Sequence, residues 1–295
     1  MSNATVPVAN VEELTDRLRQ GGYLADRGLA TSIYVALALG RPLLLEGEVG
    51  VGKTEVAKVL ASVFDRQLIR LQCYEGIDTN QALYEWDYAR QMLQIRALSE
   101  HNLADEDEVD KLFGPKFLLE RPLLTAVRAG DRAVLLIDEI DRADDEFEAF
   151  LLELLSDYQI TIPEIGTIVA ETPPIVILTS NRTRELHDAL KRRCLYHWVG
   201  YPSPEREVEI VQVRAPEAAE ALARKVVAAV GRLRQLDLAK PPGVAETLDW
   251  VATLGVLGRS VLDAGTVRDT LGAVVKERED LEAVLDHLAE IAVDG

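Results

Sequence analysis

The chain has 295 residues, of which 48% are hydrophobic, so it can bury a full core and is long enough for two domains. Its 50 acidic residues outnumber 32 lysines and arginines, and the net charge of −18 argues against nucleic acid or anionic lipid as the main substrate. The two cysteines, Cys73 and Cys194, show no metal-ligand spacing, which argues against a disulfide framework and a zinc site.

The N-terminal region reads as a polar tail followed by helices. Residues 1–14 lack the basic and apolar segments of an export signal, and no apolar run in the chain reaches the length of a membrane span. We therefore expect a cytoplasmic protein. Residues 11–20 are predicted to form a short helix that ends at a glycine pair. Residues 26–39 are predicted to form a second helix that stops at Gly40-Arg41-Pro42.

A glycine-rich stretch at residues 47–54 fits the pattern G-x-x-x-x-G-K-[ST] at every fixed position. A short apolar strand at residues 42–45 precedes it and apolar residues at helical spacing follow it, so the loop joins a strand to a helix. Glycines let several N–H groups point at one phosphate, Lys53 can reach the β- and γ-phosphates, and the Thr54 hydroxyl can bind Mg²⁺. The predicted nucleotide-binding residues here are Gly47, Glu48, Val49, Gly50, Val51, Gly52, Lys53, Thr54 and Glu55.

The segment after this helix combines a strand with an insertion. Residues 67–72 are predicted to be a second strand, and residues 74–96 mix aromatic, acidic and glutamine side chains in a pattern typical of an insertion with its own helix. The acidic run at residues 105–108 is interpreted as a solvated linker or helix start in preference to a metal site. A further helix is predicted over residues 117–129, ended by Gly130.

An acidic pair closes the next strand. Residues 133–137 are continuously apolar, which predicts a buried parallel strand, and Asp138-Glu139 follow at its carboxyl end, where open α/β sheets bind their ligands. Asp138 can hold Mg²⁺ from the side opposite Thr54, and Glu139 can polarise the attacking water as a general base. The alternative is an ordinary acidic strand end that faces solvent. The chain lacks the guanine-reading Asn-Lys-x-Asp motif, which favours ATP over GTP.

A helix, a hairpin and another strand follow. An apolar stripe over residues 147–158 predicts an amphipathic helix, and two short β-rich runs at 160–162 and 167–169 predict a hairpin. Residues 175–178 predict a buried strand that ends at Thr179-Ser180-Asn181. Asn181 can orient the attacking water and sense the γ-phosphate, or it can simply cap the next helix.

The remaining pattern divides the chain in two. A short helix over residues 186–193 and a strand over 196–199 complete an alternation of strands and helices, which predicts an α/β fold with a parallel sheet covered on both faces. The proline-rich segment 201–204 marks a boundary, because everything after it has helical periodicity. We therefore predict an α/β nucleotide-binding domain at residues 1–200 and a small all-helical lid domain at 201–295.

Together these motifs resemble the MoxR group of AAA+ ATPases, from about Gly22 to the C-terminus. The sequence is most similar to the branch that assists maturation of carbon monoxide dehydrogenase-type molybdenum hydroxylases. The segments that carry this resemblance are Cys73-Tyr74-Glu75-Gly76-Ile77-Asp78, Ala82-Leu83-Tyr84-Glu85-Trp86, Ile162-Pro163-Glu164-Ile165-Gly166-Thr167 and Thr179-Ser180-Asn181-Arg182-Thr183-Arg184-Glu185-Leu186.

The resemblance implies a homo-oligomeric ring, expected to be a hexamer, with ATP and Mg²⁺ at the subunit interfaces. It implies that residues 74–98 are the helix-2 insertion and residues 160–171 the hairpin before the sensor strand, both directed to the pore or to a client. It gives Arg193 the role of an arginine finger that reaches the neighbouring γ-phosphate, with Arg192 as a competitor for that role. It gives Arg268 the role of a second sensor arginine in the lid.

The sequence departs from the family pattern at three positions. Cys194 stands where phenylalanine usually follows the finger arginine, Val267 stands where proline usually precedes the sensor arginine, and Asp141 stands where many relatives have asparagine. Any role carried over to Asp141 is therefore in doubt, and Arg268 can equally be a solvated helix residue. Tyr84 and Trp86 can be a client grip or local core.

The resulting hypothesis is an ATP-hydrolysing chaperone that remodels a metalloenzyme awaiting its cofactor. The resemblance implies a molybdenum hydroxylase as client and a von Willebrand factor A-type protein as adaptor. One alternative is a scaffold that binds ATP and partners with little turnover. Others are a chelatase motor subunit or a DNA-acting ring ATPase, the last of which the acidic net charge disfavours.

Overall fold

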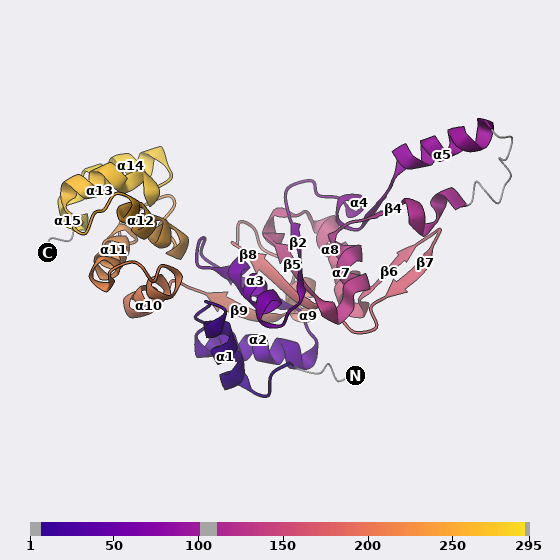
Figure 1. The fold of residues 1–295 in the computed structure, drawn as a ribbon, viewed down its shortest axis with the longest axis horizontal. Coiled ribbons are helices and arrows are strands. Elements are labelled where there is room, and N and C mark those ends of the chain that lie inside the picture. Colours follow the sequence, from indigo (N-terminus) through magenta and orange to yellow (C-terminus); the bar gives the residue numbers. More distant parts are fainter. Residues whose placement is uncertain (1–6, 101–110, 293–295) are drawn as a thin grey trace. The chain divides into compact units, whose positions relative to one another are not determined.

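The computed structural model describes residues 7–100 and 111–292 (Figure 1). The acidic run at 105–108 lies outside these residues. The chain forms two compact units, each described below by itself. The first comprises residues 1–21, 25–46 and 56–197, and the second comprises residues 22–24, 47–55 and 198–295.

The first unit is built on a five-stranded sheet with the strand order β2-β5-β8-β1-β9. Strands β2, β5, β8 and β1 pair in parallel, as predicted. Every residue of β1 and β5 is buried, because helices cover a parallel sheet and leave its central strands no solvent-facing side. The five strands are β1 (Leu43–Gly47), β2 (Gln67–Gln72), β5 (Ala133–Asp138), β8 (Ile175–Ser180) and β9 (Leu195–Val199).

The strand register brings three carboxyl ends to one edge of this sheet. Glu46 of β1 lies opposite Ser180 of β8, and Ile137 of β5 lies opposite Leu178 of β8. The residues that follow each strand therefore leave from the same edge, which is where α/β folds place their ligand chemistry.

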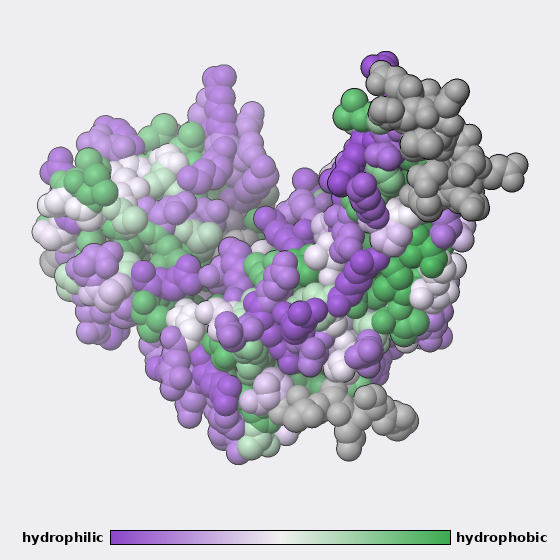
Figure 2. Space-filling view, turned by 45° about the vertical axis from the view of Figure 1, so that its right-hand side comes forward, coloured by the Kyte–Doolittle hydropathy of each residue, from purple (hydrophilic) through white to green (hydrophobic). Residues whose placement is uncertain are grey.

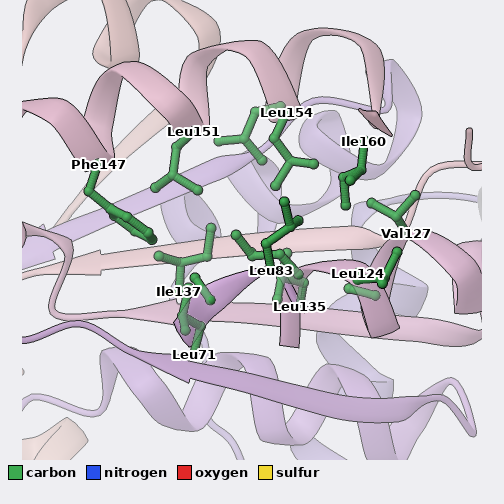
Figure 3. Packing of buried hydrophobic residues seen from close by; sticks show 14 of the residues in the cluster. Leu71, Leu83, Leu124, Val127, Leu135, Ile137, Phe147, Leu151, Leu154 and Ile160 are labelled. Atoms are coloured by element: carbon green, nitrogen blue, oxygen red, sulfur yellow. The ribbon is translucent and has the colours of Figure 1, made fainter. Parts of the chain in front are cut away.

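Helices pack on this sheet around one hydrophobic cluster. Figure 3 shows Phe147, Leu151 and Leu154 of α8 above Leu135 and Ile137 of β5. The apolar stripe predicted for α8 is thus the face that the sheet buries. The longer helices of this unit are α1 (Val11–Gln20), α2 (Arg27–Leu39), α3 (Lys53–Val63), α7 (Pro122–Ala129) and α8 (Asp145–Asp157), and a short α9 (Asp188–Arg193) precedes β9.

Local capping explains where these helices begin and end. Asn10, Asp26 and Asp144 each accept a backbone N–H of the first turn of α1, α2 and α8. Gly40 ends α2 in the left-handed conformation at φ 61°, which glycine adopts without a steric penalty.

The helix predicted over residues 117–129 begins later than expected. Leu118–Glu120 form strand β4 instead, which pairs with β3 (Tyr84–Trp86), and Pro122 occupies the first position of α7. Proline fits that position because its missing N–H has no helical partner there. The pairing joins residues more than thirty positions apart, so local periodicity did not reveal it.

The predicted insertion and hairpin are both present. The insertion contains α4 (Thr79–Ala82), β3 and α5 (Tyr88–Glu100), and the 3₁₀ turns Lys111–Phe113 and Pro115–Phe117 lead into β4. Strands β6 (Gln159–Ile162) and β7 (Gly166–Val169) pair as the hairpin. Trp86 is buried and makes edge-to-face contacts with Tyr84 and Phe113, which favours local core over a client grip.

Beyond residue 200 the second unit is helical and has its own core, centred on the fully buried Trp250. Glu207 of α10 is 1% exposed and accepts two hydrogen bonds from Arg234 and one from Thr247 of α12. The helices are α10 (Pro204–Arg214), α11 (Glu220–Leu233), α12 (Val244–Val256), α13 (Ala264–Thr270), α14 (Arg278–Leu285) and α15 (Leu288–Ile291).

The surface in Figure 2 is largely hydrophilic with smaller apolar patches, in keeping with the acidic composition. Large apolar side chains nevertheless remain exposed on α5, namely Tyr88, Met92, Leu93 and Ile95. Within residues 7–100 and 111–292, no helix combines the length and the apolar character that crossing a membrane requires.

Candidate active site

The glycine-rich loop joins β1 to α3 as predicted. Gly50 and Gly52 adopt φ values of +74° and +91°, where an L side chain would be strained. Lys53, the first residue of α3, is 6% exposed, and its Nζ donates to the carbonyl oxygens of Gly47 and Glu48 at 2.8 and 2.6 Å. The ammonium group therefore lies inside the curl of the loop, at the start of a helix, where a phosphate group fits.

The loop also needs glycine because it packs closely against backbone and side-chain atoms of its own unit. A Cβ on Gly47 would lie 2.0 Å from the carbonyl oxygen of Val199, and a Cβ on Gly50 would lie 2.8 Å from Glu246 Oε2. The N–H of Ala245 donates to the Gly50 carbonyl at 3.2 Å. The loop is thus held in its curled form by α12 of the helical unit.

Thr54 and Glu55 occupy the next two positions of α3. The half-buried Thr54 directly follows Lys53, so the two lie together at the helix start, as the predicted phosphate and Mg²⁺ roles require. The Glu55 carboxylate instead accepts a hydrogen bond from Arg214 of α10 at 3.0 Å. This contact gives Glu55 a partner on α10, and its nucleotide-binding role stays a prediction.

Asp138 is 3% exposed, and its two carboxylate oxygens have different partners. Oδ1 accepts the Thr179 hydroxyl at 2.5 Å, whereas Oδ2 accepts Nε and Nη2 of Arg70 at 3.0 and 2.6 Å. A buried carboxylate is tolerable only with such charged and hydrogen-bonded partners. The observed arrangement therefore fixes the orientation of the predicted Mg²⁺ ligand.

Sequence reasoning missed Arg70 and the role of Thr179. Arg70 is a charged residue within β2, two positions before Gln72, which lies opposite Asp138 in the sheet. A charged residue within a strand of a covered sheet indicates a partner of opposite charge nearby, but the partner becomes evident only from the strand order.

Glu139 adopts the left-handed conformation, at φ 55° and ψ 50°. Its N–H donates to Thr179 Oγ1 at 2.9 Å, and its carboxylate lies 3.3 Å from Arg142 Nε while remaining partly exposed. Non-glycine residues in this region of backbone space cost free energy and concentrate at functional sites.

Asn181 follows β8 at the same sheet edge, and its N–H donates to Asp141 Oδ2 at 3.2 Å. Asp141 is 2% exposed and also accepts the N–H and hydroxyl of Thr183 at 2.8 and 2.7 Å. The carboxylate at position 141 therefore shapes the loop that carries Asn181. The sequence analysis assigned no such role to Asp141, which stands where many relatives have asparagine.

The two candidate finger arginines lie in the exposed last turn of α9. Arg193 Nε donates to Ser156 Oγ at 2.7 Å, and the carbonyls of Arg192 and Arg193 accept hydrogen bonds from Arg41. Arg268 is exposed on α13 of the helical unit. An exposed position fits a group that acts on a neighbouring subunit, but it does not distinguish Arg192 from Arg193.

Both cysteines are buried and have no place in this chemistry. Burial, reinforced at Cys73 by the nearby carboxylate of Asp138, raises the pKa of Cys73 to about 12. Burial likewise raises the pKa of Cys194 to about 12. Both groups remain protonated thiols at neutral pH, and a thiol in that form is a poor nucleophile.

Residues 42–194 match the model of the AAA domain family, dynein-related subfamily. Gas vesicle ATPase GvpN2 of Halobacterium salinarum is 27% identical over 273 residues, which cover 88% of this chain and 76% of the relative. Gas vesicle ATPase GvpN of Haloferax mediterranei is 26% identical over 270 residues, with coverage of 88% and 75%.

Two further matches are more limited. Midasin of Giardia intestinalis is 26% identical over 174 residues, and the match spans 58% of this chain and only 3% of that protein. Among solved structures, the P216G mutant of Thermotoga maritima RuvB is similar with a TM-score of 0.49 and 16% identity, covering 89% of this chain and 72% of the other.

Proposed function

We propose a function for this chain that proceeds from its family. The chain belongs to the dynein-related subfamily of AAA domains. It is an AAA+ ATPase of the MoxR-like type that uses ATP with Mg²⁺. The proposed function is to remodel a client metalloenzyme during insertion of its cofactor, with a carbon monoxide dehydrogenase-type molybdenum hydroxylase as the client. The division into an α/β domain at 1–200 and a helical lid at 201–295, and a cytoplasmic location, belong to the same proposal.

One observation carries the catalytic part of this proposal. The carboxyl ends of β1, β8 and β5 meet at one sheet edge, so Asp138-Glu139 and Asn181 leave from the edge at which β1 passes into the phosphate loop. Parallel sheets bind ligands at this edge. A carboxylate for the metal ion, a second carboxylate for the attacking water and a polar side chain to orient that water are the groups that phosphoryl transfer to water uses.

Each residue has a defined task in hydrolysis. Gly50, Gly52 and Lys53 would hold the phosphates, since the curled loop and the inward ammonium group match their size and charge. Glu139 would take the proton from the attacking water, and Asn181 would orient that water. Arg193 of a neighbouring subunit would stabilise the charge that develops on the transferred phosphoryl group.

Thr54 and Asp138 would hold the Mg²⁺ ion, which neutralises charge on the phosphate oxygens when bound. Their hydroxyl and carboxylate oxygens suit a hard cation. The Asp138 carboxylate is held in one orientation by Arg70 and Thr179. Arg70 also compensates the buried negative charge.

Steady-state ATP consumption by purified protein tests the assignment. Glu139→Gln should lower the turnover number by about 100-fold or more while nucleotide affinity is retained, because only the general base is lost. Lys53→Ala should instead abolish nucleotide binding. If Glu139→Gln consumes ATP at the wild-type rate, Glu139 is not the base, and a nucleotide-gated scaffold becomes the better description.

The client part of the proposal rests on the family resemblance and on two projecting segments. The insertion at 74–98 exposes apolar side chains on α5, and the hairpin at 160–171 exposes Val169. Exposed apolar groups of this kind are typical of protein-contact surfaces. A hexameric ring would present several copies of both segments to one client, with a von Willebrand factor A-type protein as adaptor.

Affinity capture from native cells tests the client. The bait is Glu139→Gln loaded with ATP, and Lys53→Ala is the control that cannot bind nucleotide. We expect a molybdenum hydroxylase and a von Willebrand factor A-type protein with the bait alone. Recovery of gas vesicle proteins would instead support a second candidate, gas vesicle assembly, which two relatives that match 88% of this chain favour.

A further inference from the structure

Arg41 connects the strand that leads to the phosphate loop with the turn that carries the finger arginines. It lies between α2 and β1 in the turn Gly40-Arg41-Pro42. Its Nη2 donates to the carbonyls of Arg192 at 2.6 Å and Cys194 at 3.3 Å, and its Nε donates to the carbonyl of Arg193 at 3.1 Å. One guanidinium group thus binds three successive carbonyls at the end of α9.

The end of α9 depends on such a partner. The last carbonyls of a helix have no intrahelical donor, and a cation at that end also interacts favourably with the helix dipole. Helix α9 has only six residues, and Leu190 is its one buried side chain among them. Two further contacts fix the same region, from Arg193 Nε to Ser156 Oγ at 2.7 Å and from the Leu195 N–H to the Pro42 carbonyl at 2.8 Å.

Arg41 precedes β1 and is too far from the end of that strand to act on its own phosphate loop. Gly47 is six residues further along an extended segment, which corresponds to about 20 Å at the usual rise per strand residue. A side chain of arginine does not span that distance. Any effect of Arg41 on catalysis must therefore pass through the groups it contacts, which are the carbonyls of the finger turn.

We propose that Arg41 is a positioning residue for the arginine finger, which it holds in place through the C-terminal carbonyls of α9. The inference rests on the proposed function, because it assumes that Arg193 acts on the nucleotide of a neighbouring subunit. Without Arg41, the turn at residues 192–194 loses three hydrogen bonds. That turn would then sample positions in which Arg193 does not reach the nucleotide of the neighbouring subunit.

The first readout separates turnover from binding. Arg41→Met keeps the length of the side chain and removes its donors. It should lower the turnover number by about 10-fold and leave the affinity for a fluorescent ATP analogue unchanged, because a misplaced finger affects the transition state and not ground-state binding. Arg41→Lys, which keeps one donor group and the charge, should fall between Arg41→Met and the wild type. Arg27→Met, at an exposed arginine of α2, is the matched control and should turn over at the wild-type rate.

The second readout is complementation between defective subunits. Glu139→Gln lacks the base in its own site but offers an intact finger, whereas Arg41→Met keeps its base and offers a misplaced finger. In a ring with head-to-tail contacts, an Arg41→Met site next to a Glu139→Gln neighbour is complete. An equal mixture should therefore recover about a quarter of wild-type activity, since about half of the sites retain the base and about half of those have the required neighbour.

Two reference mixtures make the result decisive. A mixture of Arg193→Ala with Glu139→Gln should recover ATPase activity. A mixture of Arg193→Ala with Arg41→Met should not, because neither variant supplies a working finger to its neighbour. Suppose that Glu139→Gln restores activity when mixed with Arg193→Ala but not when mixed with Arg41→Met. In that case Arg41 acts within its own subunit or on folding, and the inference is wrong. If neither recovers while wild-type protein hydrolyses ATP, the finger assignment and the inference fall together and the ATPase assignment stands.

Discussion

At the scale of single residues, Thr179 serves both acidic residues with one hydroxyl group. Its Oγ1 donates to Asp138 Oδ1 at 2.5 Å and accepts the Glu139 N–H at 2.9 Å. The residue is 2% exposed, so water cannot replace either bond without rearrangement. One side chain therefore fixes both the carboxylate of Asp138 and the backbone turn at Glu139.

Replacing Thr179 with valine removes the partner of Asp138 Oδ1 and of the Glu139 N–H. We expect the free energy of unfolding to fall by about 1–3 kcal/mol, the cost of burying unpaired polar groups. Urea unfolding followed by circular dichroism measures the loss. Thr179→Ser retains the hydroxyl and is the control. Equal stability of the serine and valine variants would show that the hydroxyl contacts contribute nothing.

The backbone at Glu139 should make this position a source of strain. At φ 55° a Cβ is unfavourable and glycine is not. Glu139→Gly should therefore be more stable than Glu139→Ala by about 1 kcal/mol, although both lack the proposed base and both should hydrolyse ATP slowly. Thermal unfolding of the two variants checks the difference. An alanine variant as stable as the glycine variant would mean that the turn relaxes when the side chain is shortened.

At the scale of elements, periodicity and capping signals predicted most of the first unit. Helix α8 and strand β5 formed where an apolar stripe and an apolar run required them, and Gly40 ended α2 as expected. The pairing of β3 with β4 was missed because Trp86 and Leu118 meet only after the insertion folds back. Arg41, Arg70 and Thr179 were missed as partners for the same reason, since strand order brings them to their targets.

Three helices of the second unit share one buried charge. Glu207 of α10 accepts Arg234 Nη1 and Nη2 at 2.7 and 2.9 Å, and Thr247 of α12 donates to it at 2.5 Å. Arg234 follows directly after α11. Buried pairs of this kind are costly to break because the surviving partner is left without compensation.

Glu207→Ala should therefore destabilise the second unit by about 3–5 kcal/mol. Fluorescence of Trp250, which is fully buried in that unit, reports its unfolding in urea. The exposed pair between Arg224 and Glu220 supplies the control, and Glu220→Ala should cost about 0–1 kcal/mol. A similar cost for both variants would contradict a special role for the buried pair.

At the scale of the whole molecule, an active site completed by a neighbour ties activity to assembly. If Arg193 acts in trans, an isolated subunit lacks a group whose loss typically costs a factor of about 1,000 or more in turnover. The net charge of −18 on each chain also opposes association at low ionic strength. Activity per subunit should therefore vary with protein concentration.

We expect ATP turnover per subunit to rise steeply as the protein is concentrated through its assembly range. Parallel light scattering gives the mass of the species present at each concentration. Arg193→Ala should assemble over the same range and remain slow throughout. Turnover that is independent of concentration, in a preparation that scattering shows to be monomeric, would place every catalytic group on one chain.

The burial of both cysteines has a practical consequence. Because burial raises the pKa of Cys73 and Cys194 to about 12, the native chain should give little background with maleimide dyes at neutral pH. Val169 on the hairpin and Val256 at the end of α12 are 56% and 88% exposed. The pair Val169→Cys and Val256→Cys would accept donor and acceptor dyes without removal of either natural thiol. Energy transfer between them would then test whether the hairpin moves relative to the helical unit during ATP hydrolysis.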